Sequence, residues 1–229
     1  MEPRPLDPGE IAPSLDPGEI ASSLDPGEIA LSLDPGEIAL VPEKLRELGV
    51  ASLGRVALEI GFGGAELLLA LAAGDPDTVF VGVEVSRKRV AKAARRAARL
   101  GLANVRLVNA PAQYVLERVL PLASIAECWI NCPDPWPKRR HAPRRLFQRP
   151  LLELLERVLR PGARLHASTD DPEYARWIHA LISTSPGLEN LCAPEPWSRA
   201  RPERPATAYE TEWLAEGREL VYFEYRRRP

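Results

Sequence analysis

The stretch Arg55-Val-Ala-Leu-Glu-Ile-Gly-Phe-Gly-Gly64 decides the fold. Its first six residues form a short apolar run that ends at a glycine, and this pattern predicts a buried strand over residues 55–60. The glycines that follow let the backbone turn sharply and approach a ligand closely. Residues 65–73 are rich in alanine and leucine and predict a helix directly afterwards. A strand, a glycine turn and a helix in this order are typical of the first unit of a ligand-binding α/β sheet.

The alternation of strands and helices continues along the chain. Further helices are predicted over residues 87–100, 111–120, 151–159 and 172–183, and further strands over residues 78–84, 105–108, 125–131, 164–168 and 219–225. Parallel strands joined by helices need right-handed crossovers, which place helices on both faces of the sheet. The predicted fold class is therefore α/β, with a doubly wound, mostly parallel sheet. Such sheets bind ligands beyond the carboxyl ends of their strands.

The small net charge hides two regions of opposite sign. The 229 residues carry a formal net charge of −2. Residues 1–41 contain nine acids and one base, whereas residues 42–229 contain 29 bases and 23 acids. We therefore predict an acidic N-terminal segment of residues 1–41 and a single basic globular domain of residues 42–229.

The acidic segment is built from a nine-residue repeat. Leu-Asp-Pro-Gly-Glu-Ile-Ala begins at Leu6, Leu15, Leu24 and Leu33, and each copy carries the turn signal Asp-Pro-Gly. Few apolar residues remain between the turns, so the segment cannot bury a face and we expect it to be disordered. The alternative is that it covers a basic surface of the domain or binds a partner.

Several functional classes are disfavoured. No apolar run is long enough to span a membrane and the N-terminus lacks the apolar region of a secretory signal, so we expect a cytoplasmic protein without a membrane partner. Three cysteines are too few for a disulfide framework, and together with the three histidines they show no zinc-binding spacing. The sequence therefore predicts no metal site.

Two acids end neighbouring strands of the predicted sheet. Glu59 lies just before Gly61 and Gly63, and Glu84 ends the second strand. The third glycine of a dinucleotide-binding turn is replaced by Glu66, whose charge would repel a pyrophosphate. Glu59 suits a cationic group, and an acid placed like Glu84 commonly accepts hydrogen bonds from a ribose diol. These features favour S-adenosylmethionine; another nucleotide, or a turn that binds no cofactor, is the alternative.

A proline-rich loop follows the fourth predicted strand and reads Asn131-Cys-Pro-Asp-Pro-Trp-Pro-Lys-Arg-Arg-His141. The prolines stiffen this loop, and Asp134 falls where a transferred group would meet its acceptor. Clustered bases beside it suit phosphate binding, namely Lys138, Arg139, Arg140, Arg144, Arg145 and Arg149. A solvated charged face with a structural Pro-Trp turn is the alternative.

A second basic region is the predicted helix over residues 87–100. No acid occurs from Ser86 to Leu116, so the helix does not read as a balanced, ion-paired face. We expect it to contact an RNA backbone, with Arg199, Arg201, Arg204 and the C-terminal arginines adding to the same surface. The alternative is that these side chains merely solvate exposed helices.

Three motifs in order resemble the tRNA (guanine-N7-)-methyltransferase family of class I S-adenosylmethionine-dependent methyltransferases. They are Pro133-Asp-Pro-Trp-Pro-Lys-Arg-Arg-His141, Ala167-Ser-Thr-Asp170 and Arg204-Pro-Ala-Thr-Ala-Tyr-Glu210. The resemblance runs from about Val56 to Arg226. It implies a Rossmann-like fold and methyl transfer from S-adenosylmethionine to N7 of a guanosine in the variable loop of tRNA. Methylation of another RNA position or of a small molecule, or RNA binding without catalysis, are the alternatives.

The resemblance also implies roles for individual residues. Asp134 would be the catalytic residue, and the cofactor would contact Glu59, Gly61, Gly63, Glu84, Asn109, Ala110 and Asp134. The guanosine and its surroundings would contact Lys138, Asp170, Thr207, Ala208, Tyr209 and Glu210. Two positions depart from the family pattern: Ala65, where a glycine is frequent, and Pro111, where an acid is expected. The oligomeric state stays open between monomer and homodimer.

Overall fold

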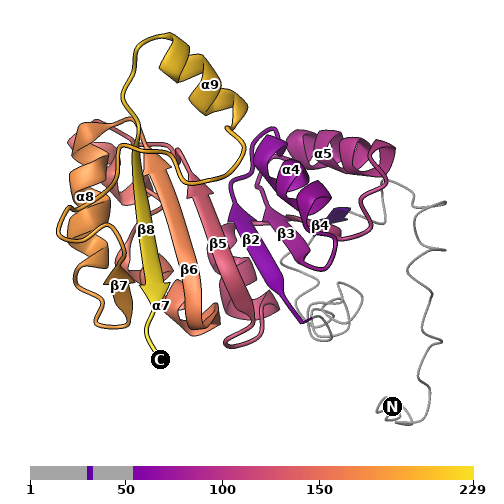
Figure 1. Cartoon of the computed structure of the whole chain (residues 1–229), viewed down its shortest axis with the longest axis horizontal. Helices are drawn as coiled ribbons and strands as arrows, with labels where there is room; N and C mark the ends of the chain where they lie inside the picture. The colour runs from indigo at the N-terminus through magenta and orange to yellow at the C-terminus, as the bar shows by residue number, and fades with distance from the viewer. Residues whose placement is uncertain (1–29, 33–53) are drawn as a thin grey trace.

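A twisted sheet runs through the molecule, and the computed structural model describes it over residues 30–32 and 54–229. The sheet has eight strands in the order β1-β4-β3-β2-β5-β6-β8-β7 (Figure 1). All neighbouring strands are parallel except β8, which is antiparallel to both β6 and β7. The strands are β1 Ala30–Ser32, β2 Val56–Ile60, β3 Val79–Val83, β4 Val105–Asn109, β5 Ile125–Asn131, β6 Leu159–Thr169, β7 Leu188–Asn190 and β8 Val221–Arg227.

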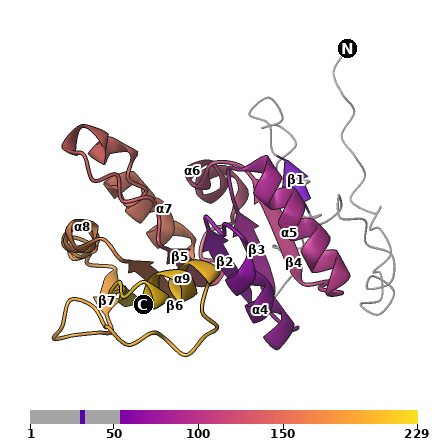
Figure 2. The ribbon, with the colours of Figure 1, turned by 90° about the horizontal axis from the view of Figure 1, so that it is seen from above.

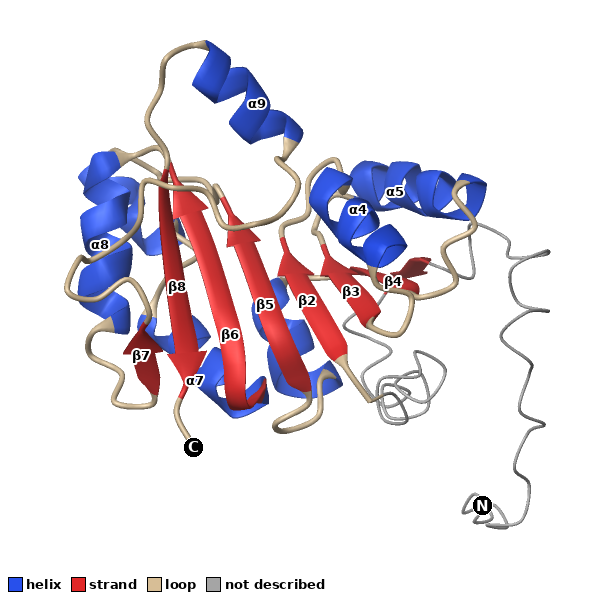
Figure 3. Ribbon diagram, viewed as in Figure 1, coloured by secondary structure: helices blue, strands red, loops and turns tan. Residues whose placement is uncertain are grey.

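Helices cover both faces of the sheet (Figures 2 and 3). They are α4 Glu66–Gly74, α5 Arg87–Arg99, α6 Ala112–Tyr114, α7 Arg149–Val158, α8 Pro172–Ile182 and α9 Ala208–Ala215. A π-helical turn over Val115–Val119 extends α6, and a 3-10 helix spans Arg139–Arg144. In the orientation of Figure 1, α9 lies above the carboxyl ends of the central strands. Among the described residues, none of the helices is long and apolar enough to cross a membrane.

Two hydrophobic cores lie on opposite faces of the sheet. On one face α4 and α5 contribute Leu68 and Ala94 to a cluster that includes Phe80 of β3. On the other face α7 and α8 contribute Leu155 and Ile178 to a larger cluster with β5, β6 and β8. The parallel strands β2 and β3 are buried along their whole length, as expected for strands covered on both faces.

The predicted doubly wound α/β fold is confirmed. Every predicted strand and helix has its counterpart, with ends shifted by a few residues at most positions and a longer start of β6. The sequence analysis did not predict β1, β7, the 3-10 helix or α9. The two missed strands have three residues each, too short for a period to be recognised. The disorder expected for residues 1–41 concerns residues outside the described ranges, apart from Ala30–Ser32, which form β1 beside β4.

Candidate active site

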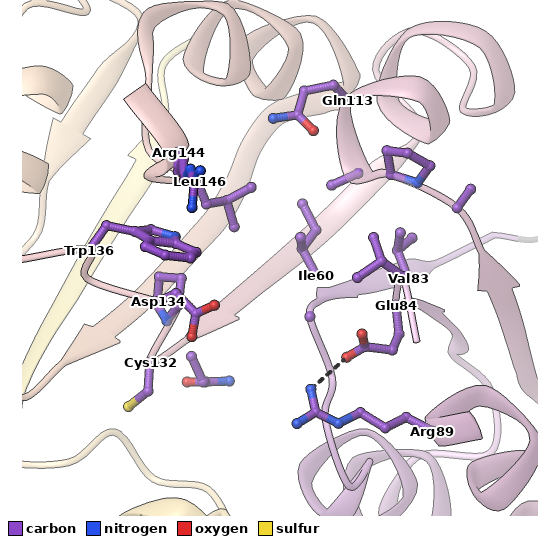
Figure 4. Close-up of a pocket in the computed structure, with 17 residues that line it drawn as sticks. Ile60, Val83, Glu84, Arg89, Gln113, Cys132, Asp134, Trp136, Arg144 and Leu146 are labelled. Carbon is purple, nitrogen blue, oxygen red and sulfur yellow. Dashed lines mark ion pairs between the residues drawn. The ribbon is translucent and has the colours of Figure 1, made fainter. Parts of the chain in front are cut away.

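Two adjoining cavities open at the carboxyl edge of the sheet, where β2, β3, β4 and β5 end. Their volumes are about 420 and 340 Å³, within the usual range for small-molecule sites. They share the residues Gly61, Arg89, Asn131, Cys132 and Asp134. The first cavity lies between β3 and the proline-rich loop (Figure 4), and the second extends from Glu59 to the start of α9.

The glycine turn between β2 and α4 leaves open space beside its backbone. Gly61 and Gly63 have positive φ angles of 72° and 54°, and a Cβ added at either residue would meet nothing within 4 Å. A ligand can therefore approach the backbone here. Ala65, which precedes α4, also has a left-handed φ of 60°, a conformation that costs a non-glycine residue about 1–3 kcal/mol. This conformation explains why a glycine would be favoured at the position of Ala65.

Glu84 is fixed at the first cavity by backbone donors. Its carboxylate accepts hydrogen bonds from the N–H groups of Gly63 at 3.2 Å and Ser86 at 2.9 Å. Arg89 lies 3.6 Å from the same carboxylate, and both side chains line the cavity in Figure 4. The side chain of Asn109 donates to the backbone carbonyl of Glu84 at 2.9 Å. Through this hydrogen bond Asn109 holds the end of β4 next to Glu84. Ala110 lines the first cavity, whereas Asn109 does not.

Glu59 presents a buried and incompletely paired carboxylate to the second cavity. One oxygen, Oε1, lies 3.4 Å from the amide nitrogen of Asn131. The other oxygen, Oε2, is buried without a hydrogen-bond partner among the described residues. Burial raises the pKa of Glu59 to about 8. An orphaned carboxylate oxygen suits a cationic group of a ligand, because such a group would supply the missing charge and donor.

Two residues that flank Asp134 in the proline-rich loop have strained backbone conformations. Cys132 and Trp136, two residues on either side of it, both have a left-handed φ of 43°. Non-glycine residues keep this conformation only where the surroundings enforce it. The N–H of Cys132 donates to the carbonyl oxygen of Ser168 at 3.0 Å, which fixes the start of the loop. The carboxylate of Asp134 points into the first cavity opposite Glu84 (Figure 4).

Arg145 fixes the other end of the loop. Its guanidinium donates from Nε to the carbonyl oxygen of Pro135 at 2.8 Å and pairs with Glu173 at 2.9 Å. The same group lies over the rings of Tyr174 and Trp177. Only 2% of the Arg145 side chain is exposed. The expectation that Arg145 binds phosphate is therefore wrong, because the side chain is buried; its neighbour Arg144 lines the first cavity beside Trp136.

The late motif surrounds the start of α9. Thr207 caps the helix in a capping box with Glu210, and Thr207, Ala208 and Tyr209 line the second cavity. Glu210 is fully buried and forms a bidentate ion pair with Arg204, at 2.6 and 2.8 Å. Although burial alone would raise the pKa of Glu210, the hydrogen bonds from Arg204 and Thr207 lower it. The expected guanosine contact of Glu210 stays a prediction, but its observed contacts hold α9 in place.

Arg204 connects the late motif to the end of β5. Besides Glu210, it contacts Asn131 Oδ1 at 3.1 Å, and Ser168 Oγ donates to the same oxygen at 3.3 Å. The expectation that Arg204 lies on an RNA-binding surface is wrong, since 1% of its side chain is exposed. One polar cluster thus contains Glu59, Asn131, Arg204 and Glu210. Glu59 and Asn131 line the second cavity, whereas Arg204 and Glu210 are buried.

Three predicted substrate residues do not line these cavities: Lys138, Asp170 and the buried Glu210. Lys138 is exposed just before the 3-10 helix. Asp170, at the end of β6, pairs with Arg218 at 3.1 Å and lines a separate cavity. Conversely, Arg89, Gln113 and Asn131 line the cavities without having been predicted there, and Arg144, one of the bases expected beside the proline-rich loop, lines the first cavity. Asn131 could have been identified from the sequence, because it is a polar residue at the end of a predicted strand. Within residues 54–229, no cluster of His, Cys, Asp or Glu could hold a metal ion.

Solved structures show the same fold. The 16S rRNA methyltransferase KamB superposes with a TM-score of 0.57 at 17% identity, over 86% of this chain and 95% of that chain. A SAM-dependent methyltransferase from Aquifex aeolicus superposes with a TM-score of 0.54 at 17% identity, over 93% of this chain and 100% of that chain. At this level of identity the similarity concerns the fold alone.

Sequence relatives define the family. A family model described as "Putative methyltransferase" matches residues 54–223. A tRNA (guanine-N(7)-)-methyltransferase from Halorhodospira halophila is 38% identical over 196 residues, which are 82% of this chain and 83% of that protein. One from Syntrophotalea carbinolica is 34% identical over 174 residues, covering 76% of this chain and 75% of that protein. With the predicted motifs assembled at one edge of a methyltransferase fold, the chain belongs to the tRNA (guanine-N(7)-)-methyltransferase family.

Proposed function

We propose that this protein transfers a methyl group from S-adenosylmethionine to N7 of a guanosine in the variable loop of tRNA. The observation that carries the proposal is the position of Asp134, which lies on both cavities, one bounded by Glu84 and the other by Glu59 and the start of α9. Family membership supports the same activity. Because tRNA is a cytoplasmic substrate, the proposal includes a cytoplasmic location.

The residues around the glycine turn fit the methyl donor. Glu84 would accept hydrogen bonds from the ribose hydroxyls, and the open backbone at Gly61 and Gly63 would allow close approach. Ala110 and its apolar neighbours on the first cavity would pack against the adenine. Glu59 would bind the amino group, which its unpaired oxygen favours. When bound, S-adenosylmethionine supplies an electrophilic methyl group on a sulfonium.

The protein has little proton chemistry to perform on the acceptor. Guanine N7 carries an in-plane lone pair and needs no prior deprotonation, so catalysis would rest on positioning and electrostatics. Asp134 would accept hydrogen bonds from guanine N–H groups and stabilise the positive charge that develops on the ring. Tyr209 is half-exposed on the second cavity, where it can stack against a base.

The test combines purified protein, unmodified tRNA and isotopically labelled methyl donor, followed by mass analysis of the nucleosides. We expect the label in 7-methylguanosine and its loss in Asp134→Ala. Label in a different nucleoside would assign the enzyme to another RNA position. Binding of tRNA without any incorporation would indicate a non-catalytic RNA-binding protein and contradict the proposal.

A further inference from the structure

The outer face of α5 carries a straight row of basic side chains. Lys88, Lys92, Arg95 and Arg99 are spaced by four, three and four residues, which places them on one face of the helix. At a rise of 1.5 Å per residue, this ridge is about 16 Å long. All four side chains belong to exposed residues. We call this set the α5 ridge.

The α5 ridge is free of ion pairs with the residues that the structure describes in ranges 30–32 and 54–229. Of the three other bases in the helix, two have carboxylate partners: Arg89 in the first turn pairs with Glu84, and Arg96 pairs with Glu66. The helix itself contains no acid. Four adjacent positive charges without local compensation repel one another, and this cost favours the binding of a polyanion.

The remainder of α5 acts as a rigid support for the ridge. Val90, Ala93, Ala94 and Ala97 are buried against the sheet, and the Ser86 side chain caps the first turn by accepting from the N–H of Arg89 at 3.4 Å. The buried alanines pack closely, so the basic side chains are not needed to complete the core. Lys92, Arg95 and Arg99 line an open groove together with Ala98.

The ridge starts beside the candidate active site. Helix α5 begins three residues after Glu84, and Arg89 in its first turn lines both cavities. Figures 1 and 2 show α5 in the outer layer, running away from the carboxyl edge of β3 and β4. When the reacting nucleotide of an RNA lies at Asp134, the RNA segments next to that nucleotide can therefore reach the α5 ridge.

We propose that the α5 ridge binds the phosphodiester backbone of the RNA substrate at a distance from the methylated nucleotide. This inference rests on the proposed function. An RNA backbone fits better than a protein surface, because the centre of a protein interface is depleted of lysine and enriched in aromatic and apolar side chains. The ridge has no aromatic residue, and Leu100 beyond its end is the exposed large apolar residue nearest to it among those described.

The test compares two variants with the same change in charge. The ridge variant is Lys88→Gln, Lys92→Gln, Arg95→Gln and Arg99→Gln combined; glutamine preserves helix propensity. The control variant is Arg55→Gln, Arg118→Gln, Arg160→Gln and Arg164→Gln combined. Arg55 precedes β2, Arg118 lies in the π-helical turn, and Arg160 and Arg164 belong to β6. None of these four residues lines either candidate cavity. The dissociation constant for unmodified tRNA is measured in the full chain over a series of salt concentrations.

We expect the ridge variant to bind tRNA at least tenfold more weakly at low salt. The slope of log affinity against log salt should fall by about 3, corresponding to four lost phosphate contacts. At about 0.1 M salt and above, where long-range charge effects are screened, the control variant should stay within about twofold of the unchanged protein. Binding of S-adenosylmethionine, measured by calorimetry, should be the same in both variants.

Equal tRNA affinity of the ridge and control variants would overturn the proposal. Equal affinity combined with a lower melting temperature of the ridge variant would show that the ridge pairs with the acidic residues of this chain instead. The nucleoside assay on the unchanged protein separates this failure from failure of the proposed function. If that protein forms 7-methylguanosine while ridge and control variants bind tRNA alike, the ridge proposal alone fails.

Discussion

Arg145 donates a hydrogen bond from Nε to the carbonyl oxygen of Pro135, 2.8 Å away, and so holds the residue that follows Asp134. Arg145 belongs to a chain segment that packs against α8, through Glu173, Tyr174 and Trp177. The proline-rich loop is therefore attached to the outer helix layer at one end and to β6, through Cys132 and Ser168, at the other. This double attachment maintains the left-handed residues that flank Asp134.

Replacing Arg145 should impair catalysis through the position of Asp134. Arg145→Met keeps much of the side-chain length and the contacts with the aromatic rings but removes the hydrogen bond to Pro135. We expect the kcat of methyl transfer to fall at least tenfold, because small misplacements of reacting groups have effects of about 100-fold. The affinity for S-adenosylmethionine should change little. Arg118→Met, at an exposed residue of the π-helical turn, is the control. A similar kcat in both variants would contradict the positioning role.

Removing the carboxylate of Asp134 should abolish transfer without unfolding the protein. Asp134 is exposed on the cavities, so Asp134→Asn and Asp134→Ala should shift the melting temperature by no more than a few degrees. We expect less than about 1% of the initial rate in single-turnover assays, a loss typical of an electrostatic contact made in the transition state. Asp77→Asn, exposed at the amino edge of β3, is the control. A rate for Asp134→Asn within twofold of that control would refute the catalytic assignment.

Donor binding should depend on pH through Glu59. Burial raises the pKa of this carboxyl to about 8, so it is mostly neutral at pH 7 in the free protein. A cationic ligand group favours the ionised form, so binding releases a proton and affinity should rise with pH up to about 8. Below that pH, full coupling gives about a tenfold loss of affinity per unit. Calorimetry between pH 6.5 and 8.5 tests this; a profile as flat as that of Glu59→Gln would show that no proton is coupled.

The same pKa also predicts how Glu59 affects stability. The folded state holds this proton between the ordinary pKa of 4.5 and about 8, whereas the unfolded state releases it. The free energy of unfolding contributed by Glu59 should therefore fall as pH rises through this window. Denaturation of the unliganded protein at several pH values should show a steeper decline than in Glu59→Gln. Parallel curves for the two proteins would contradict the raised pKa.

The ion pair of Arg204 with Glu210 should stabilise the attachment of α9. Glu210→Ala leaves a buried guanidinium without its carboxylate and should lower the free energy of unfolding by about 3–5 kcal/mol. Glu210→Gln keeps hydrogen-bonding atoms and should cost less. Glu216→Gln, at the exposed end of α9, is the control and should change stability by no more than about 0.5 kcal/mol. Urea denaturation measures all three; a loss in Glu210→Ala below about 1 kcal/mol would speak against this role.

Deleting residues 2–40 tests the boundary between the acidic segment and the domain. Within this range the structure describes three residues, Ala30–Ser32, which extend the sheet by one short edge strand. We expect the deleted form to remain folded and to change its affinity for tRNA modestly. Circular dichroism and thermal denaturation measure the effect. A melting temperature lowered by more than about 10 °C would show that the acidic segment is part of the fold.

Local patterns made most of the fold predictable. The apolar run of β2 is followed by a glycine, and that of β3 by a glutamate. These runs are nearly continuous because both strands are covered by helices on both faces of the sheet. The capping box of Thr207 and Glu210 was also visible in the sequence, as Thr-x-x-Glu, and would have predicted α9. The very short β7 could not be recognised, because it exists through its pairing with β8 and not through a pattern of its own.

The sequence by itself determined the order of most strands and helices along the chain and the position of the glycine turn, because these depend on neighbours a few positions apart. Only the tertiary structure decided which charged side chains are exposed on the surface and which are buried in the interior. Arg99, Arg145 and Arg204 look alike in the sequence, yet the first is exposed and the others are buried. Their partners Glu173 and Asn131 lie 28 and 73 residues away along the chain. Burial of a charge depends on such distant partners, and these meet only when the chain folds.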